Sequence, residues 1–187
     1  MKFNSTLLAL SVAALFATGT ANAAITGTPS AKLTVQSTIT AGTCTAKVTN
    51  SAGADATEVN FGDVYKADLE NKSRVEPLKI SFTCCAGVKK AMVSAASGTG
   101  GSCSGNNLDG DAYAAGQNTA FELWSGAVDS GLQLNCKTPP AAQAVTITSG
   151  VGEFPMNSRI VIAKDKTIAD VGTGSVTAPV TFTVTYQ

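Results

Sequence analysis

Hydrophobic and polar residues alternate with a period of two along several stretches of this 187-residue chain. The stretch 78–85 has an apolar face made by Leu78, Ile80, Phe82 and Cys84. A second stretch reaches the C-terminus, and threonines separate its apolar residues Val180, Phe182, Val184 and Tyr186. This period is typical of half-buried β-strands. Shorter stretches predict further strands at 58–64, 91–95, 120–124, 132–136, 144–148 and 159–163. Many short strands predict one all-β domain, a β-sandwich, in which the polar segment 97–118 is a long loop or hairpin connection.

One further alternating stretch lies near the N-terminus. Its apolar face is made by Ala31, Leu33, Val35, Ser37 and Ile39, and lysine, glutamine and threonines occupy the other face. This segment has two interpretations. It is either an ordinary first strand of its own sheet or a strand whose apolar face binds another molecule.

The first 23 residues have the features of an export signal. Lys2 is followed by a mostly apolar run at 7–17, and Ala21 and Ala23 form a small-x-small cleavage pattern. We predict a signal peptide at 1–23. The alternative is an uncleaved membrane anchor, but the apolar run is short for a bilayer span.

The charge balance and the absence of histidine exclude several function classes. The chain has 13 basic and 13 acidic side chains, which provides no basic surface for nucleic acid. It has no histidine, so Ser-His and Cys-His catalytic sites are excluded and the commonest metal ligand is missing. We therefore expect no enzyme, no cofactor, no metal site and no catalytic residue.

The five cysteines are Cys44, Cys84, Cys85, Cys103 and Cys136. In an exported protein most of them should form disulfides, which leaves one free thiol. A bridge from Cys44 to Cys84 or Cys85 would close a long loop, whereas a bridge between the adjacent pair would be strained.

Several motifs in order along the chain resemble a known family. One is a V-x-F-G-x-V segment, made by Val59, Phe61, Gly62 and Val64. Another leads into the second cysteine through Pro77, Leu78, Ile80 and Phe82. The strongest is the ending, with Val171, Gly174, Val176, Ala178, Thr181, Phe182, Thr183, Tyr186 and Gln187. In these features the chain resembles the subunits of chaperone–usher pili of the type 1 fimbrial kind.

The resemblance implies an incomplete immunoglobulin-like β-sandwich that lacks its final strand. A donor strand from another subunit completes such a fold. In this chain residues 24–40 would be the donor-strand extension and 41–187 the pilin domain. In this family the groove first accepts a strand from the chaperone and later the donor strand of the next subunit. The strand that forms this groove would include Gly174, Val176, Val180, Phe182, Val184, Tyr186 and Gln187.

The family pattern also bears on the donor strand and on the cysteines. Pilins have a glycine where this donor segment has Ser37, whose hydroxyl needs a partner if it is buried. The pattern pairs Cys44 with Cys85 and leaves Cys84 on the apolar face. We expect Cys103 to pair with Cys136, with a bond from Cys84 to either one as the alternative.

The function implied is that of a structural subunit of a chaperone–usher fimbria, which polymerises by donor-strand exchange and supports bacterial cell adhesion. Its partners would be other pilus subunits in a head-to-tail polymer, a periplasmic chaperone and an outer-membrane usher, with a host receptor as a further candidate. The chain would pass through the periplasm to the cell surface. Alternatives are a single-domain fimbrial adhesin, a terminating subunit, and a secreted soluble β-sandwich binding protein or hydrolase that uses 31–39 internally.

Overall fold

The computed structural model describes residues 42–50 and 52–187. The predicted signal peptide and the predicted donor strand, with Ala31, Leu33, Val35, Ser37 and Ile39, lie outside the described residues.

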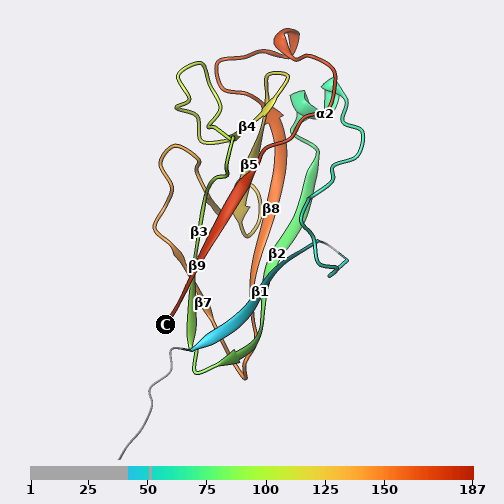
Figure 1. The fold of residues 1–187 in the computed structure, drawn as a ribbon. Coiled ribbons are helices and arrows are strands. Elements are labelled where there is room, and N and C mark those ends of the chain that lie inside the picture. Colours follow the sequence, from blue (N-terminus) through green and yellow to red (C-terminus); the bar gives the residue numbers. More distant parts are fainter. Residues whose placement is uncertain (1–41, 51) are drawn as a thin grey trace, which may run out of the picture. The chain divides into compact units, whose positions relative to one another are not determined.

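Two antiparallel sheets enclose the core of the described part (Figure 1). The larger sheet has the order β1-β2-β8-β5-β4, with β6 beside β5. Its strands are β1 (Thr43–Asn50), β2 (Val75–Ala86), β4 (Tyr113–Gly116), β5 (Thr119–Ser125), β6 (Leu132–Gln133) and β8 (Gly152–Ile162). The smaller sheet, in the order β7-β3-β9, contains β7 (Gln143–Thr146), β3 (Lys90–Ser97) and β9 (Val180–Tyr186). The connections contain the helix α2 (Lys66–Asn71) and the 3₁₀ turn η1 (Ile168–Asp170). Neither these two segments nor any other described helix is long and apolar enough to cross a membrane.

The core follows from the alternation within the strands. Ile80 and Phe82 of β2 are 2% and 1% exposed, and Ala91 and Val93 of β3 are 0% and 1% exposed. They belong to one apolar cluster that both sheets supply. Because successive side chains point to opposite faces of a strand, this arrangement leaves the intervening polar residues on the outside.

Most of the predicted strands are present. The two long alternating stretches form β2 and β9, and the predictions at 91–95 and 120–124 are confirmed as β3 and β5. The stretch 144–148 contains the shorter β7, and 159–163 is the end of the much longer β8.

The strand predicted at 58–64 is wrong. This segment has no strand pairing, although Phe61 is buried. Gly62 adopts a φ of 61°, and its N–H donates to Asn60 Oδ1 at 2.8 Å. A side chain therefore replaces a neighbouring strand as the hydrogen-bond partner, while Val59 and Val64 still pack against the core.

Other boundaries also differ from the prediction. Only the first two residues of 132–136 form a strand. The Leu134 N–H still donates to the Leu123 carbonyl of β5, whereas the Cys136 N–H donates to the Asp111 carbonyl outside that strand. The predicted loop 97–118 contains β4. The sequence analysis does not predict strand β1 or helix α2. Neither segment has a clear periodic pattern of apolar residues.

A bulge near the end of β2 corrects the prediction for Cys84. Thr43 pairs with Ala86 and Thr45 with Thr83, so both Cys84 and Cys85 lie opposite Cys44. Cys84 adopts a φ of 53° and is exposed, whereas it was expected on the apolar face. The extra residue in the bulge interrupts the alternation, so Cys85 packs against the core instead.

The described residues contain two disulfides, Cys44–Cys85 and Cys103–Cys136. These are the two pairs expected from the sequence. Cys84 is the free thiol, so the alternative bonds from Cys84 to Cys103 or Cys136 are not formed. The first disulfide joins β1 to the bulge of β2, and the second anchors the segment before β4 to the one after β6.

Candidate functional site

Strand β9 has one edge that pairs with β3 and one edge that pairs with no described strand. Gln187 and Lys90 exchange both of their backbone hydrogen bonds, at 2.8 and 3.0 Å, and Gly98 donates to the Pro179 carbonyl at 2.9 Å. Hydrogen-bonded positions alternate in an antiparallel pair, so Thr181, Thr183 and Thr185 also face β3. The N–H and C=O groups of the residues between them point to the open edge. These residues are Val180, Phe182, Val184 and Tyr186.

The same four residues turn their side chains toward the core. All four are half-buried and pack against the main apolar cluster, whereas the three threonines between them are exposed. An edge strand with unpaired backbone groups and an apolar inner face is a template for pairing with another chain. The sequence explains this arrangement, because the alternation of valine, phenylalanine and threonine places all apolar side chains on one face.

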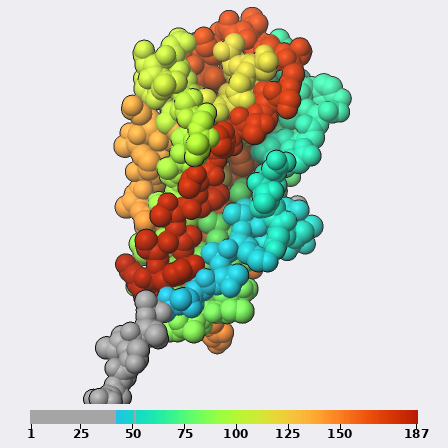
Figure 2. All heavy atoms as spheres, in the orientation of Figure 1, coloured from blue at the N-terminus to red at the C-terminus, as the bar shows by residue number. Residues whose placement is uncertain are grey.

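A groove of about 1460 Å³ opens beside this strand. One wall is the segment 171–182, which leads into β9, and the other is the segment 56–66, which follows β1. Figure 2 shows the red C-terminal segment and the blue-to-teal segment on the same face of the molecule. The floor is formed by inward-facing side chains of β2, β5 and β8.

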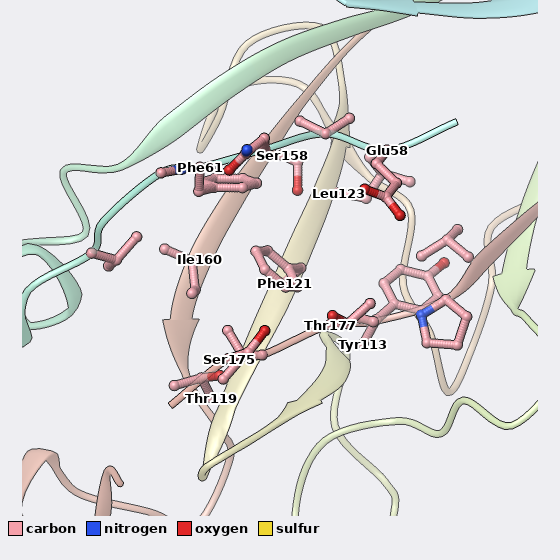
Figure 3. Close-up of a pocket in the computed structure, with 18 of the residues that line it drawn as sticks. Glu58, Phe61, Tyr113, Thr119, Phe121, Leu123, Ser158, Ile160, Ser175 and Thr177 are labelled. Carbon is pink, nitrogen blue, oxygen red and sulfur yellow. Dashed lines mark hydrogen bonds between the residues drawn. The ribbon is translucent and has the colours of Figure 1, made fainter. Parts of the chain in front are cut away.

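Two apolar clusters meet in this groove (Figure 3). The first cluster contributes Leu78, Tyr113 and Leu123, with Val48, Val180 and Phe182 packed against them. The second cluster contributes Phe61, Leu69, Ile160 and Val171, with Val64, Phe121 and Val176 packed against them. The rings of Phe61 and Phe121 are 5.0 Å apart, which is within the range of a favourable aromatic contact.

Buried polar groups of the floor have partners. The Tyr113 hydroxyl donates to the Leu134 carbonyl at 3.0 Å, and burial raises the pKa of Tyr113 to about 12. The Ser158 hydroxyl donates to the Glu122 carbonyl at 3.1 Å. The floor is therefore a stable, largely apolar surface.

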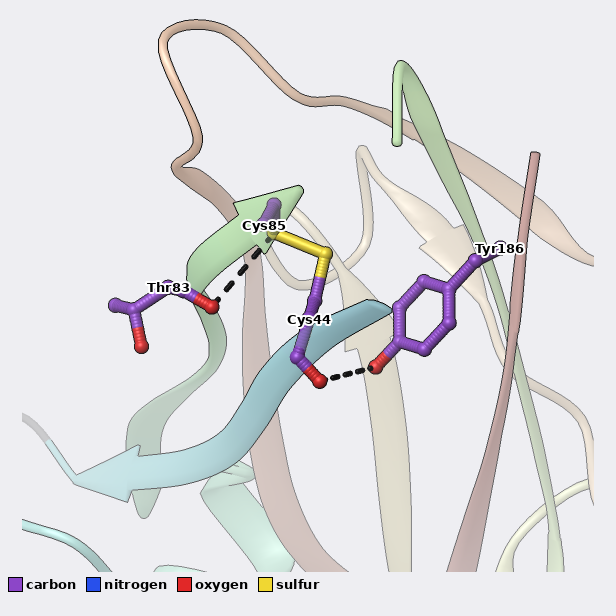
Figure 4. Close-up of a disulfide and its surroundings, with 4 residues drawn as sticks. All are labelled: Cys44, Thr83, Cys85 and Tyr186. Carbon is purple, nitrogen blue, oxygen red and sulfur yellow. Dashed lines mark hydrogen bonds between the residues drawn. A yellow bond between two sulfur atoms is a disulfide. The ribbon is translucent and has the colours of Figure 1, made fainter. Parts of the chain in front are cut away.

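The C-terminal end of β9 is connected to β1. The Tyr186 hydroxyl donates to the Cys44 carbonyl at 3.3 Å, close to the Cys44–Cys85 disulfide (Figure 4). This contact ties together the two strands that border the open edge.

The structure places the predicted acceptor residues in three different positions relative to the groove. Val180 and Phe182 lie in β9 and line the groove, and Gly174 and Val176 line it from the segment before the strand. Val184 and Tyr186 lie beyond the groove, on the part of β9 that approaches Cys44. Gln187 binds β3 through its backbone.

Sequence reasoning missed much of the opposite wall and of the floor. The sequence predicts Phe61 and Val64 as part of a family motif and of a strand, and Ile160 as part of a strand, but none of them as lining the groove. The alternation along 154–162 contains a signal for the floor, because it places Ser158 and Ile160 on the inner face.

An ion-pair cluster lies on the outer face of the larger sheet. Arg159 is 4% exposed and donates to both carboxylate oxygens of Asp129, at 2.7 and 2.8 Å, and to Glu122 at 2.8 Å. The guanidinium of Arg159 holds the pKa of Asp129 below its usual value. The contact anchors the loop that contains Asp129 to the sheet, and it lies on the face opposite the groove.

Comparisons with known proteins find relatives of this chain by sequence and by structure. No family model matches the chain. The fimbrial-like protein YadL of Escherichia coli K12, itself uncharacterised, is 38% identical over 175 residues, which cover 86% of each chain. A structure of a chaperone–usher pilus superposes with a TM-score of 0.53 at 18% identity, over 86% of this chain and 98% of the other. The P pilus rod subunit PapA superposes with a TM-score of 0.49 at 16% identity, over 75% of this chain and 99% of PapA.

These findings show that the chain has the fold of pilus subunits, an incomplete immunoglobulin-like sandwich. The chain belongs to the family of fimbrial-like proteins that includes YadL. This membership favours a fimbrial protein over the hydrolase alternative.

Proposed function

We propose that this protein polymerises head to tail by donor-strand exchange. Residues 31–39 of one copy would lie along the open edge of β9 in the next copy and place their apolar face in the groove. The observation that carries the proposal is the open backbone edge of β9 above an apolar groove. Because the donor and acceptor surfaces are different parts of the chain, such a contact does not close and generates a fibre.

The energies agree with a stable contact. Burial of Leu33, Val35 and Ile39 at about 1.5–3 kcal/mol each would contribute roughly 5–9 kcal/mol before ordering costs. Backbone hydrogen bonds to the edge of β9 would add to this value. Dissociation would expose the core of the acceptor as well as break the contact, so we expect it to be slow.

The proposal extends to the assembly route. The signal peptide 1–23 would direct export, a periplasmic chaperone would cover the open edge before polymerisation, and an outer-membrane usher would release the subunits to the cell surface. Residues 24–40 would then serve as the donor extension and 41–187 as the pilin domain. In a fimbria built in this way, the protein would support cell adhesion.

The test uses residues 41–187 and a synthetic peptide of residues 24–40. For a domain of this size, each kcal/mol of stabilisation raises the melting temperature by about 2–4 °C. We expect the peptide to raise it by on the order of 10 °C or more. A control peptide with Val35→Asp should have little effect, because a carboxylate would enter the apolar groove. Equal melting temperatures with and without the peptide would contradict the proposal.

The open groove bears on the terminating-subunit alternative. A terminating subunit needs no acceptor site, whereas the groove in this protein is open along β9. The single-domain adhesin alternative depends on the region that the Cys103–Cys136 disulfide anchors. Screening of the peptide-completed domain on a glycan array tests this alternative separately.

A further inference from the structure

The segment 171–177 forms part of one wall of the groove but belongs to no described strand. It connects η1 to the residues just before β9, and we call it the lead-in segment. Val171 is 6% exposed, and Val176 packs against the same apolar cluster. Apolar burial has no preferred direction, so these contacts draw the lead-in segment inward without fixing where its backbone lies.

Two backbone hydrogen bonds connect the lead-in segment to the end of the β4–β5 hairpin. The Gly172 N–H donates to the Gln117 carbonyl at 3.1 Å, and the Thr177 N–H donates to the Ala115 carbonyl at 2.9 Å. Among the described residues, the backbone of 172–177 has no other hydrogen-bond partner. The Ala115 carbonyl is free to accept because a shift in the pairing of β4 with β5 leaves Ala115 opposite no residue.

The side chains of the turn residues Gln117 and Asn118 strengthen this anchor. Asn118 Nδ2 donates at 2.8 Å to the carbonyl of Asp170, the residue directly before the lead-in segment. Gln117 lies over the backbone of two glycines. A Cβ added to Gly172 would collide with Gln117 Oε1 and lie 3.2 Å from its Cδ, and one added to Gly174 would lie 3.5 Å from its Nε2. The lead-in segment comes this close to the turn because glycine has no side chain.

We propose that Asn118 is a positioning residue of the acceptor groove. Its amide fixes the point at which the lead-in segment leaves η1, and so holds this wall in place before a donor strand arrives. Ser175 and Thr177 of the wall line the groove together with Tyr113 and Thr119 of the hairpin (Figure 3). A wall that is already in position loses less conformational freedom when the donor binds, which strengthens binding. This inference rests on the proposed function.

The conformation of the turn permits substitutions that remove little except the amide. Gln117 and Asn118 have φ angles of 49° and 58°, which are typical of a type I′ turn. Glycine is favoured at the second position of this turn, so Asn118→Gly should preserve the hairpin. Asn118→Asp keeps the shape of the side chain but turns an acceptor toward the Asp170 carbonyl. Ser149→Gly is a matched control, because Ser149 has a φ of 52° in the turn between β7 and β8 and does not line the groove.

The test applies two measurements to the full mature chain. Amide hydrogen exchange before assembly reports on Gly172 and Thr177, and the rate at which assembled polymers dissociate in denaturant reports on donor retention. We expect both Asn118 variants to exchange these two amides faster, and their polymers to dissociate about 2–10 times faster, as for the loss of one hydrogen bond. The Thr183 amide, which binds β3, should keep its wild-type exchange and so separate local release of the wall from loss of the fold. Ser149→Gly should change neither measurement.

The outcomes separate this inference from the proposed function. If the wild-type chain polymerises and both Asn118 variants dissociate at the wild-type rate, Asn118 does not position the groove, whatever the exchange of Gly172 and Thr177, and donor-strand exchange stands. If Ser149→Gly accelerates dissociation as much as Asn118→Gly, the effect belongs to turns in general and the inference is wrong. If the wild-type chain forms no polymer, the proposed function fails and this inference fails with it.

Discussion

Two proline substitutions in β9 should separate folding of the subunit from polymerisation. The N–H of Val184 points to the open edge, while the N–H of Thr183 points to β3, opposite Ser94. Proline has no N–H, and its ring blocks close approach of a strand on that side. Val184→Pro therefore disables the open edge, and Thr183→Pro disables the edge that holds the subunit together.

The free energy that the open edge contributes to polymerisation follows from the number of its backbone N–H and C=O groups. Four residues of β9 offer four N–H and four C=O groups at the open edge, and each hydrogen bond contributes about 0.5–1.5 kcal/mol net. A complete ladder would therefore contribute roughly 4–12 kcal/mol. Val184→Pro removes one hydrogen bond of this ladder. The proline ring also clashes with the incoming strand and prevents the neighbouring hydrogen bonds from forming. A loss of only about 1.4 kcal/mol already changes the equilibrium tenfold, so we expect a larger decrease in polymer.

The assay compares the melting temperature of the monomer with the amount of polymer found by sedimentation. Val184→Pro should melt within a few degrees of the wild type and form at least about tenfold less polymer. Thr183→Pro should lower the melting temperature of the monomer clearly, because it breaks the β3–β9 ladder. Wild-type polymerisation of Val184→Pro would refute the assignment of this edge as the acceptor.

Three further predictions concern the subunit itself. Replacing both Cys103 and Cys136 by serine should destabilise the domain by about 2–4 kcal/mol in denaturant titration, since the disulfide closes a long loop; an unchanged midpoint would show that it adds nothing. The exposed Cys84 thiol should react with one equivalent of a maleimide in the native protein, and Cys84→Ser should abolish labelling without a change in melting temperature. Asp129 has a pKa lowered by Arg159, so its stabilising effect is present above the unfolded pKa near 4 and is lost as the pH falls through the folded value. Melting curves between pH 2 and 7 should therefore show a smaller loss on acidification in Asp129→Asn than in the wild type.

The sequence predicts the long strands well because their burial follows a simple alternation. In β2 and β9 the apolar side chains face the core at every second residue, and the structure has the same faces. The same reasoning fails at 58–64, where Val59 and Phe61 are apolar and pack inward. Burial of a side chain does not require strand pairing, and in this segment Asn60 satisfies the backbone instead.

The bulge and the groove are harder to predict. Nothing in the alternation of 78–85 indicates that an extra residue at Cys84 turns its thiol outward, because a bulge depends on the pairing between β1 and β2. The acceptor strand was predicted from its motif, whereas the opposite wall depends on how 56–66 packs across the sandwich. The alternation of β8 does identify Ser158 as an inward-facing polar residue.

Residue-resolved amide hydrogen exchange of the domain 41–187, with and without the 24–40 peptide, tests the central claim most directly. We expect the amides of Val180, Phe182, Val184 and Tyr186 to exchange fast in the domain alone and slowly with the peptide. The amides of Thr181, Thr183 and Thr185 should be protected in both states, because they already bind β3. Equal protection of the first set with and without the peptide would contradict the claim that this edge of the sandwich is open and is completed by the donor strand.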